Sequence, residues 1–227
     1  MFELDPKRRE AILGFCFARL KEEGGFGASP YLPPTIEDTY FAVKILNLLK
    51  ASFPAEGTIL FLRQKAKAPL PPRLAFFLKE TLSLLGFPFA PQVLLPRAPK
   101  LDEGFYLKLL GHPLEKVPAL SPRPTLEELF FYAYLAPEQA RNYLPYVLRA
   151  QNPDGGFGFY PGTTSFLENA YYALKFLRVF KTQVKKPEAL RDYVIACWRR
   201  EGFARSPGGI PFLEATYQAL EILSLLG

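Results

Sequence analysis

Five positions along the chain pair a charged residue with an aromatic residue three places later, each at the expected start of a helix. The charged residues are Glu37, Arg73, Glu127, Glu168 and Glu214. The aromatic residues that follow them are Tyr40, Phe76, Phe130, Tyr171 and Tyr217. Residues three apart share a helix face, so each charge would stand one turn from a ring. Carboxylates and aromatic faces stabilise positive charge, so the pattern suits a carbocation or a bound cation.

The same residues also have a structural explanation. Acidic side chains in a first helical turn interact favourably with the helix dipole, by about 0.3–1 kcal/mol each. Residues 165–168 ("SFLE") and 125–128 ("TLEE") read as capping boxes, and repeated aromatic residues are commonly core. From the sequence alone, these residues could either contact a ligand or stabilise their helices.

Polar residues continue along the same helical face. At seven and ten places after the charged positions stand Lys44, Asn47, Glu80, Ser83, Lys175, Arg178, Glu221 and Ser224. Helical positions 0, 3, 7 and 10 share a face. If this face lines a lumen, the lumen is aromatic near one mouth and polar beyond it.

An internal repeat carries these positions. The segments "EEGGFGASPYLPPTIEDTYFAVKILNLL", "PDGGFGFYPGTTSFLENAYYALKFLRVF" and "REGFARSPGGIPFLEATYQALEILSLLG" align without gaps. Gly27 and Tyr40 are 13 positions apart, as are Gly158 and Tyr171. Two weaker copies, "SPRPTLEELFFYAYL" and "PLPPRLAFFLKETLSLLG", lack the glycine turn. A regular repeat of this length predicts a repeat architecture.

The repeat predicts helical hairpins joined by glycine loops. Further helices are expected at about 5–22, 57–67, 101–111, 137–150 and 187–200, between the repeat helices. Pro6, Pro137 and Pro187 fall near the starts of three of them, as a first-turn proline should. The Pro-rich residues 86–101 are expected to be irregular, and strands have little support anywhere. We therefore expect an all-α fold in a single domain, 1–227.

The motif "QNPDGGFG", followed by an acidic residue and "YYAL" on the next helix (residues 151–174), resembles the prenyltransferase and squalene-cyclase repeat. That family includes protein prenyltransferase β subunits and class II terpenoid cyclases, and the resemblance implies an α/α toroid of alternating inner and outer helices. Such toroids usually have six hairpins, whereas about five are countable here. We therefore expect either an α/α toroid or an open, shortened version of it, and the ring could also be completed by a partner.

The zinc site of protein prenyltransferases has no counterpart in the matching residues. The family's Asp-x-Cys pair falls on Glu37 and Thr39, Glu168 and Ala170, or Glu214 and Thr216. The zinc of that family is held in part by a cysteine thiolate, which these positions lack, so zinc-dependent protein prenylation is not expected. Neither a metal nor another cofactor is expected.

The acidic motif of class II cyclases has a partial counterpart at residues 35–39, "TIEDT". The resemblance implies that Glu37 is the proton donor and Asp38 its partner, with Thr35 in place of the family's first aspartate. A carboxylic acid kept protonated by burial is an established catalytic device.

The amino-acid composition argues against several other classes of function. The chain has 227 residues, 49% hydrophobic and 22% charged, with a net charge of +6 that is scattered along the sequence. Scattered basic residues give no clear nucleic-acid surface, and no apolar run is long enough to span a membrane. A start without a signal-peptide pattern predicts a cytoplasmic protein. Cys16, Cys197 and His112 are the only residues of their kinds and stand far apart, so a Cys-His site is not expected.

These observations favour a protein that binds an apolar, isoprenoid-type ligand at the aromatic mouth of a toroid. Acid-initiated chemistry would then start at Glu37, with Tyr40, Phe130, Tyr171 and Tyr217 shielding positive charge. The alternative is a non-catalytic helical scaffold that binds a protein partner or a second copy of itself. A closed cavity with a buried Glu37 would support the first function, and an open arc the second.

Overall fold

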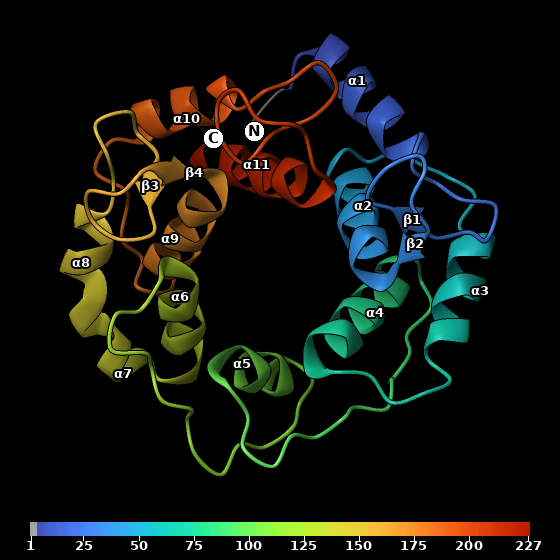
Figure 1. Cartoon of the computed structure of the whole chain (residues 1–227), viewed down its shortest axis with the longest axis horizontal. Helices are drawn as coiled ribbons and strands as arrows, with labels where there is room; N and C mark the ends of the chain where they lie inside the picture. Colours follow the sequence, from blue (N-terminus) through green and yellow to red (C-terminus); the bar gives the residue numbers. More distant parts are fainter. Residues whose placement is uncertain (1–3) are drawn as a thin grey trace.

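Among residues 4–227, which the computed structural model describes, six helices line the inside of a ring (Figure 1). They are α2 (Ile36–Leu48), α4 (Pro72–Leu84), α5 (Leu101–Leu109), α6 (Leu126–Leu135), α9 (Leu167–Val179) and α11 (Leu213–Leu226). Each inner helix packs on the next, and α11 packs on α2. The ring is therefore closed, which decides between the complete toroid and the open or shortened version that the sequence left possible.

The outer layer is incomplete. It consists of α1 (Pro6–Phe17), α3 (Glu56–Lys65), α10 (Pro187–Ala196) and a broken segment of α7 (Pro137–Ala140), the 3-10 helix η1 (Arg141–Tyr143) and α8 (Leu144–Arg149). Pro6, Pro137 and Pro187 each begin a helix, as predicted. Irregular chain covers α4 and α5 on the outside instead of helices, and its prolines lack the N–H that a helix needs (Figure 1).

The helix expected at 101–111 exists, but its place in the ring was not foreseen. We expected an outer helix, and the structure has α5 on the inner layer between α4 and α6. No glycine loop precedes α5, so its repeat signal is weak. Its N-terminus is held instead by Glu103, whose carboxylate accepts a hydrogen bond from the Lys100 N–H at 2.8 Å.

Two short strand pairs lie in the glycine loops, where the sequence predicted no strand. β1 (Phe26–Gly27) pairs with β2 (Pro34–Thr35), and β3 (Phe157–Gly158) pairs with β4 (Ser165–Phe166), both antiparallel. Each pair is only two residues long and folds the loop back onto the helix that follows. The phenylalanine of each glycine motif is fully buried there, as the repeat suggested.

Glycine is required where these loops meet the next outer helix. Gly24 has a φ of +92°, and a Cβ on it would lie 2.1 Å from the carbonyl carbon of Gly57 in α3. Gly155 has a φ of +87°, and its Cβ would lie 2.0 Å from the carbonyl oxygen of Ala189 in α10. Since no side chain fits such an approach, the glycine turns fix how closely neighbouring hairpins pack.

No helix in the described part of the chain is both long and apolar enough to cross a membrane. The core lies between the two helical layers, where side chains such as Ile12, Leu46, Leu62 and Phe176 are fully buried. This core leaves the opposite face of each inner helix free to line the centre of the ring.

Candidate functional site

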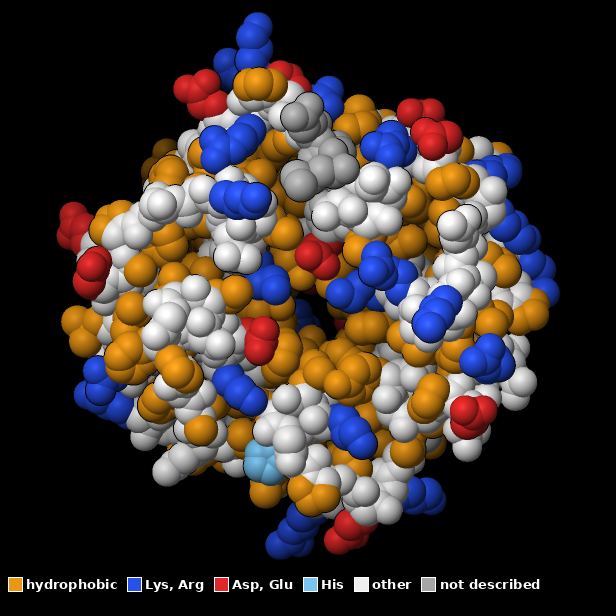
Figure 2. Space-filling view, turned by 180° about the vertical axis from the view of Figure 1, so that it is seen from behind, with side chains coloured by type: hydrophobic (Ala, Val, Ile, Leu, Met, Phe, Trp, Pro, Cys, Tyr) orange, Lys and Arg blue, Asp and Glu red, His pale blue; other side chains and the backbone are white. Residues whose placement is uncertain are grey.

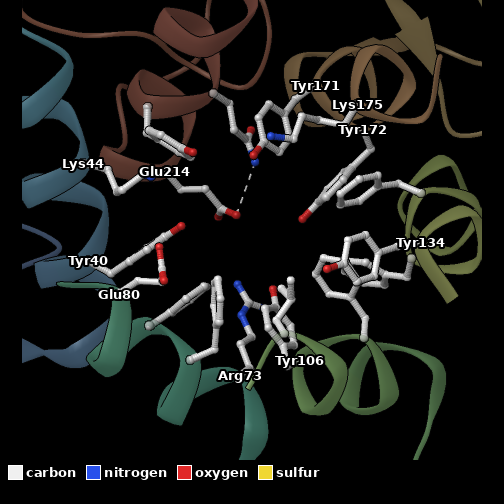
Figure 3. A pocket seen from close by; sticks show the side chains of 18 of the residues that line it. Tyr40, Lys44, Arg73, Glu80, Tyr106, Tyr134, Tyr171, Tyr172, Lys175 and Glu214 are labelled. Carbon is white, nitrogen blue, oxygen red and sulfur yellow. Dashed lines mark hydrogen bonds between the residues drawn. The ribbon is translucent and has the colours of Figure 1, made fainter. Parts of the chain in front are cut away.

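The ring encloses a central cavity of about 570 Å³, lined by side chains of all the inner helices. Figure 2 shows its opening on one face of the molecule, with basic, acidic and apolar side chains around the edge. Figure 3 shows tyrosine, lysine, arginine and glutamate side chains pointing into this space from the surrounding helices. The polar stripe of the inner helices therefore faces the lumen.

A continuous ring of aromatic side chains surrounds the middle of the cavity, and we call it the aromatic belt. Its members, in order around the ring, are Tyr40, Phe77, Tyr106, Phe131, Tyr172, Tyr171 and Tyr217. The centroid distances between successive rings are 4.1, 5.8, 6.0, 6.0, 5.2, 6.1 and 6.3 Å, the last from Tyr217 back to Tyr40. Such distances are typical of interacting aromatic pairs. The belt is closed.

Sequence reasoning identified part of this belt. Of the expected aromatic residues, Tyr40, Tyr171 and Tyr217 belong to it, and Phe76 and Phe130 line the cavity beside it. Phe77, Tyr106, Phe131 and Tyr172 were missed. The signal was present as adjacent aromatic pairs, Tyr40-Phe41, Phe76-Phe77, Phe105-Tyr106, Phe130-Phe131 and Tyr171-Tyr172. On a helix that points into a narrow lumen, two adjacent positions both reach the cavity.

The predicted charged positions gather at one end of the lumen, at the N-termini of the inner helices. We call Glu37, Glu127, Glu168 and Glu214, together with Arg73 and Arg205, the acidic rim. Arg73 forms an ion pair with Glu37. Arg205, on the third glycine loop, lies 3.3 Å from the Glu168 carboxylate and 3.8 Å from that of Glu214. The sequence did not single out Arg205, because it lies on a loop outside the helical pattern.

The rim glutamates do not cap their helices. In α2 and α6 the caps are made by Thr35 with Asp38, and by Thr125 with Glu128. The capping box at 125–128 is thus confirmed. The one at 165–168 is wrong, because Phe166 is the N-cap of α9 and the Ser165 hydroxyl bonds to Asp154. Within residues 4–227 the four rim carboxylates make no hydrogen bond to a backbone N–H of their helices, so helix capping does not account for them.

The rim carboxylates lie in different surroundings. Glu214 lines the central cavity and also a hollow of about 620 Å³ beside it, whereas Glu37 and Asp38 line only that hollow. Glu127 and Glu168 line a smaller pocket of about 200 Å³ next to Tyr172. Glu37, with 41% of its side chain exposed, is not the buried acid that the sequence suggested.

Burial changes the acidity of several of these groups. Burial raises the pKa of Glu214, against the opposing charges of Arg73 and Arg205. Burial likewise raises the pKa of Glu127, although the Tyr172 hydroxyl and Arg73 oppose the shift. Burial also raises the pKa of Asp38, opposed by its hydrogen bond from Thr35. The central cavity therefore has one acid on its wall, Glu214, that is shifted toward the protonated form.

One side chain of the acidic rim and one beside it have unpaired donors. The Nε atom of Arg73 and the Nδ2 atom of Asn169 are buried without a hydrogen-bond partner in the described part of the chain. Both residues line the small pocket beside Tyr172. An acceptor atom in that pocket, from water or from a ligand, would satisfy them.

At the opposite end of the lumen lies a group of basic side chains. We call Lys44, Lys175 and Arg178 the basic mouth; all three line the central cavity. The Lys44 ammonium lies 5.9 Å from the Tyr40 ring centroid and 5.7 Å from that of Tyr217. The Lys175 ammonium lies 5.5 Å from the Tyr171 ring and 3.6 Å from the Glu221 carboxylate. The basic mouth thus directly adjoins the aromatic belt.

The positions that would hold zinc have structural roles here. The Thr39 hydroxyl accepts a hydrogen bond from the Phe26 N–H at 3.0 Å, and Thr216 does the same for Phe203. Ala170 has no donor atom on its side chain. Among residues 4–227, no three His, Cys, Asp or Glu side chains are grouped to hold a metal ion. Burial raises the pKa of Cys16 to about 12 and that of Cys197 to about 11, so neither thiol is a ready ligand. These residues do not fit zinc.

The chain matches one known protein family. A family model described as the prenyltransferase alpha-alpha toroid domain matches residues 1–66 and 165–227. The two matched stretches are neighbours in space, since α11 packs on α2. No curated protein matches the chain.

Proposed function

The chain belongs to the prenyltransferase α/α-toroid family, and on that premise we propose that it binds an apolar, isoprenoid-type ligand in its central cavity. The observation that carries this proposal is the closed aromatic belt around a lumen of about 570 Å³. A scaffold has no need of a hollow centre lined by aromatic side chains. Ligand pockets typically have this volume and this apolar, aromatic wall with a few polar groups.

The proposal extends to acid-initiated chemistry, with Glu214 as the proton donor. Its carboxyl group lines the cavity beside Tyr217, and burial raises its pKa. Transfer of its proton to an alkene carbon of the ligand forms a C–H bond from the π electrons and leaves a carboxylate. The positive charge on the adjacent carbon would face the belt, whose rings stabilise cations. Return of a proton from the ligand to Glu214 completes an isomerisation or a cyclisation.

Glu37 is less suited to that role. It forms an ion pair with Arg73 and lies outside the central cavity. Asp38 is committed to the Thr35 cap, with 2.6 Å between the Thr35 hydroxyl and its carboxylate. Their catalytic assignment stays a prediction, and Glu214→Gln and Glu37→Gln variants discriminate between the two donors in any assay of ligand conversion. Loss of turnover in the Glu37 variant alone would return the role to Glu37.

Binding is tested with a variant that fills the cavity. Leu109 lines the lumen, so Leu109→Trp adds bulk there while every belt residue is kept. Leu60→Trp on the outer helix α3, where Leu60 is 58% exposed, is the matched control. Native mass spectrometry and titration with farnesol are the measurements. We expect the wild type and the control to bind farnesol, and Leu109→Trp to bind it about tenfold more weakly or not at all.

A different result would contradict the proposal. If farnesol and geranylgeraniol fail to bind the wild type, or bind Leu109→Trp equally well, the cavity is not the ligand site. The scaffold function would then gain support from the glycine-loop tips, where Tyr31 is 95%, Ile210 68% and Leu32 53% exposed. Exposed apolar side chains grouped on loops mark protein contacts. A change of oligomeric state in Tyr31→Ser with Ile210→Ser would identify self-association.

A further inference from the structure

One stretch of the outer surface has many basic residues and almost no acidic ones. Between Gly57 and Lys100 the only acidic residue is Glu80, whose side chain lines the central cavity. The exposed basic residues of the same stretch are Arg63, Lys65, Lys67, Arg97 and Lys100. Among the residues that the structure describes, none of these side chains forms an ion pair. Their positive charges are therefore available to an external partner.

The Pro-rich segment 86–100 is held against α3 and the connection that follows it, on the outside of α4 (Figure 1). The Leu70 N–H donates a hydrogen bond to the Gln92 carbonyl at 2.9 Å, and the Leu94 N–H donates to the Leu70 carbonyl at 2.8 Å. The Arg63 guanidinium of α3 lies 5.3 Å from the Phe87 ring centroid. The exposed side chains of the segment therefore share one surface with basic residues of α3 and its connection.

The segment divides its apolar side chains between core and solvent. Leu85, just before it, and Phe89 are partly buried and pack on the core. Phe87, Leu94 and Leu95 are instead 39%, 51% and 64% exposed. Covering α4 does not require the outward leucines, since much of their apolar surface stays in water, which is unfavourable. Exposed apolar side chains that are grouped, rather than scattered singly, mark an interaction site.

We propose that this surface docks the protein on a membrane that contains anionic lipid. We call it the outer basic face; its members are Phe87, Leu94, Leu95, Arg63, Lys67 and Arg97. The leucines would enter the boundary between headgroups and acyl chains, and the basic side chains would lie against the negatively charged headgroups. The face lies outside the ring, so the proposal does not depend on the proposed function.

The chemistry of the face favours a membrane over other occupants. A nucleic acid would match the charge, but proteins hold its bases by stacking on aromatic side chains, and this face exposes two leucines and a single phenylalanine. Aliphatic side chains need a hydrocarbon phase, and the basic residues beside them need negative charge. A bilayer with anionic lipid supplies both in one plane. A second copy of the chain could offer its acidic rim instead, and the test includes that outcome.

Vesicle binding is the first measurement. Flotation of the wild-type protein is compared for vesicles of phosphatidylcholine alone and for vesicles of phosphatidylcholine and phosphatidylserine at about three to one. We expect the affinity for the anionic vesicles to be at least about tenfold higher, because each basic residue near such a surface contributes about fivefold. The preference should shrink as salt is raised, because exposed charges are screened.

A pair of substitutions that keeps the net charge tests the leucines. Leu94→Ser with Leu95→Ser removes apolar surface, and the affinity for anionic vesicles should fall about tenfold or more. The matched control is Tyr31→Ser with Ile210→Ser, which replaces two exposed apolar side chains on the glycine loops and should bind as the wild type does. Thermal melting checks folding, which these exposed positions should not alter.

A second pair tests the basic residues at equal loss of charge. Lys67→Gln with Arg97→Gln should lower the affinity for anionic vesicles by at least about tenfold. Lys185→Gln with Lys186→Gln removes the same charge from exposed positions before α10 and should lower it far less. This comparison separates a specific face from general adsorption of a protein with a net charge of +6.

A fluorescent reporter tests insertion without removing apolar surface. The chain has one tryptophan, Trp198, which is half-buried far from segment 86–100 in sequence. The emission of Leu95→Trp should shift to shorter wavelength when anionic vesicles are added, because the new side chain enters a less polar environment. Tyr31→Trp is the control, and its emission should not change.

Several outcomes would overturn the proposal. These are equal affinity for both kinds of vesicle, full binding by the leucine variant, equal losses in the two charge variants, or no emission shift in Leu95→Trp. A wild-type dimer without lipid that the leucine variant fails to form would identify a second copy as the occupant. Farnesol binding by the leucine variant should equal that of the wild type, so vesicle binding and the proposed function can fail independently.

Discussion

At the scale of single residues, one repeat position produces groups of different chemistry. Glu37 and Glu214 occupy equivalent places at the starts of α2 and α11. Glu37 is half-exposed and paired with Arg73, whereas Glu214 is more deeply placed on the cavity wall. The difference comes from neighbouring helices and from a loop arginine, not from the residue itself. Burial raises the pKa of the Glu214 carboxyl, because desolvation disfavours its charged form.

The raised pKa of Glu214 predicts a specific pH dependence of stability. The folded protein holds this proton to higher pH than the unfolded chain, whose carboxyl titrates near 4.5. The free energy of unfolding of the wild type should therefore fall as the pH rises from 4.5 through the folded pKa. Glu214→Gln lacks this loss, so its stability relative to the wild type should increase over that range, as measured by urea denaturation at several pH values.

The charged groups around Glu214 determine whether the free energy of unfolding falls or rises with pH. Burial raises its pKa, while Arg73 and Arg205 oppose the shift and Glu37 and Glu168 add to it. If the free energy of unfolding of Glu214→Gln instead decreases relative to that of the wild type as the pH rises, the charges of Arg73 and Arg205 outweigh burial, and the pKa of Glu214 is not raised. Glu115→Gln on the exposed surface is the control and should show no such trend.

At the scale of elements, the glycine loops show how one spacing supports different anchors. In the first and third loops a threonine hydroxyl, thirteen residues downstream, accepts the N–H of the buried phenylalanine. The middle loop has Ala170 at that place. It is held instead by Asn152, whose amide donates to Ser165 at 2.9 Å, and by Ser165, whose hydroxyl donates to Asp154 at 2.8 Å. The first and third loops thus close on their helices through one threonine hydroxyl that accepts a buried backbone N–H, whereas the middle loop is closed by hydrogen bonds among three side chains.

This anchor predicts the effect of Thr39→Val. The substitution keeps the shape of the side chain but leaves the buried Phe26 N–H without its acceptor. We expect the free energy of unfolding to fall by about 1–3 kcal/mol. Thr164→Val, at an exposed loop position, is the matched control, with an expected change within about 0.5 kcal/mol. Equal effects of the two substitutions in urea denaturation would show that the hydroxyl is not an anchor.

At the scale of the whole molecule, closure of the ring depends on the contact between α11 and α2. Tyr217 on α11 meets Tyr40 and Phe41 on α2 at centroid distances of 6.3 and 5.8 Å. It also meets Tyr171 on α9 at 6.1 Å, so one side chain links three inner helices. The same contact joins the segments farthest apart in sequence and completes the wall of the cavity. Tyr217 thus contributes both to ring closure and to the wall of the cavity.

Tyr217→Ala should therefore destabilise the protein strongly. Truncation of a large buried aromatic side chain costs about 3–5 kcal/mol, and Tyr217 is only 5% exposed. Tyr31→Ala, at a residue that is 95% exposed, is the matched control and should change stability by less than about 0.5 kcal/mol. Denaturation curves measure both. A loss below about 1 kcal/mol for Tyr217→Ala would indicate that ring closure does not depend on this contact.

The amino-acid sequence by itself determined the repeat, the helical content and the toroid family. These follow from local rules: a fixed glycine-to-tyrosine spacing, proline at helix starts, and a periodic apolar face. The same periodicity predicted that Tyr40, Tyr171 and Tyr217 line the lumen, because one face of each inner helix is directed toward the centre of the ring. Phe77, Phe131 and Tyr172 were detectable in the sequence as aromatic pairs and were missed because only one position per turn was considered.

The tertiary structure alone decided the remaining features. It placed α5 on the inner layer and closed the ring, since helix order does not specify which layer a helix joins. It brought Arg205, which lies on a loop, into contact with Glu168 and Glu214. These two glutamates lie on different helices, α9 and α11, so the sequence gives no sign of the contact. It gave Glu37 and Glu214 different surroundings, because burial and neighbouring charges are set by the packing of the helices. Residue types repeat along a chain, but their surroundings are set only when the ring closes.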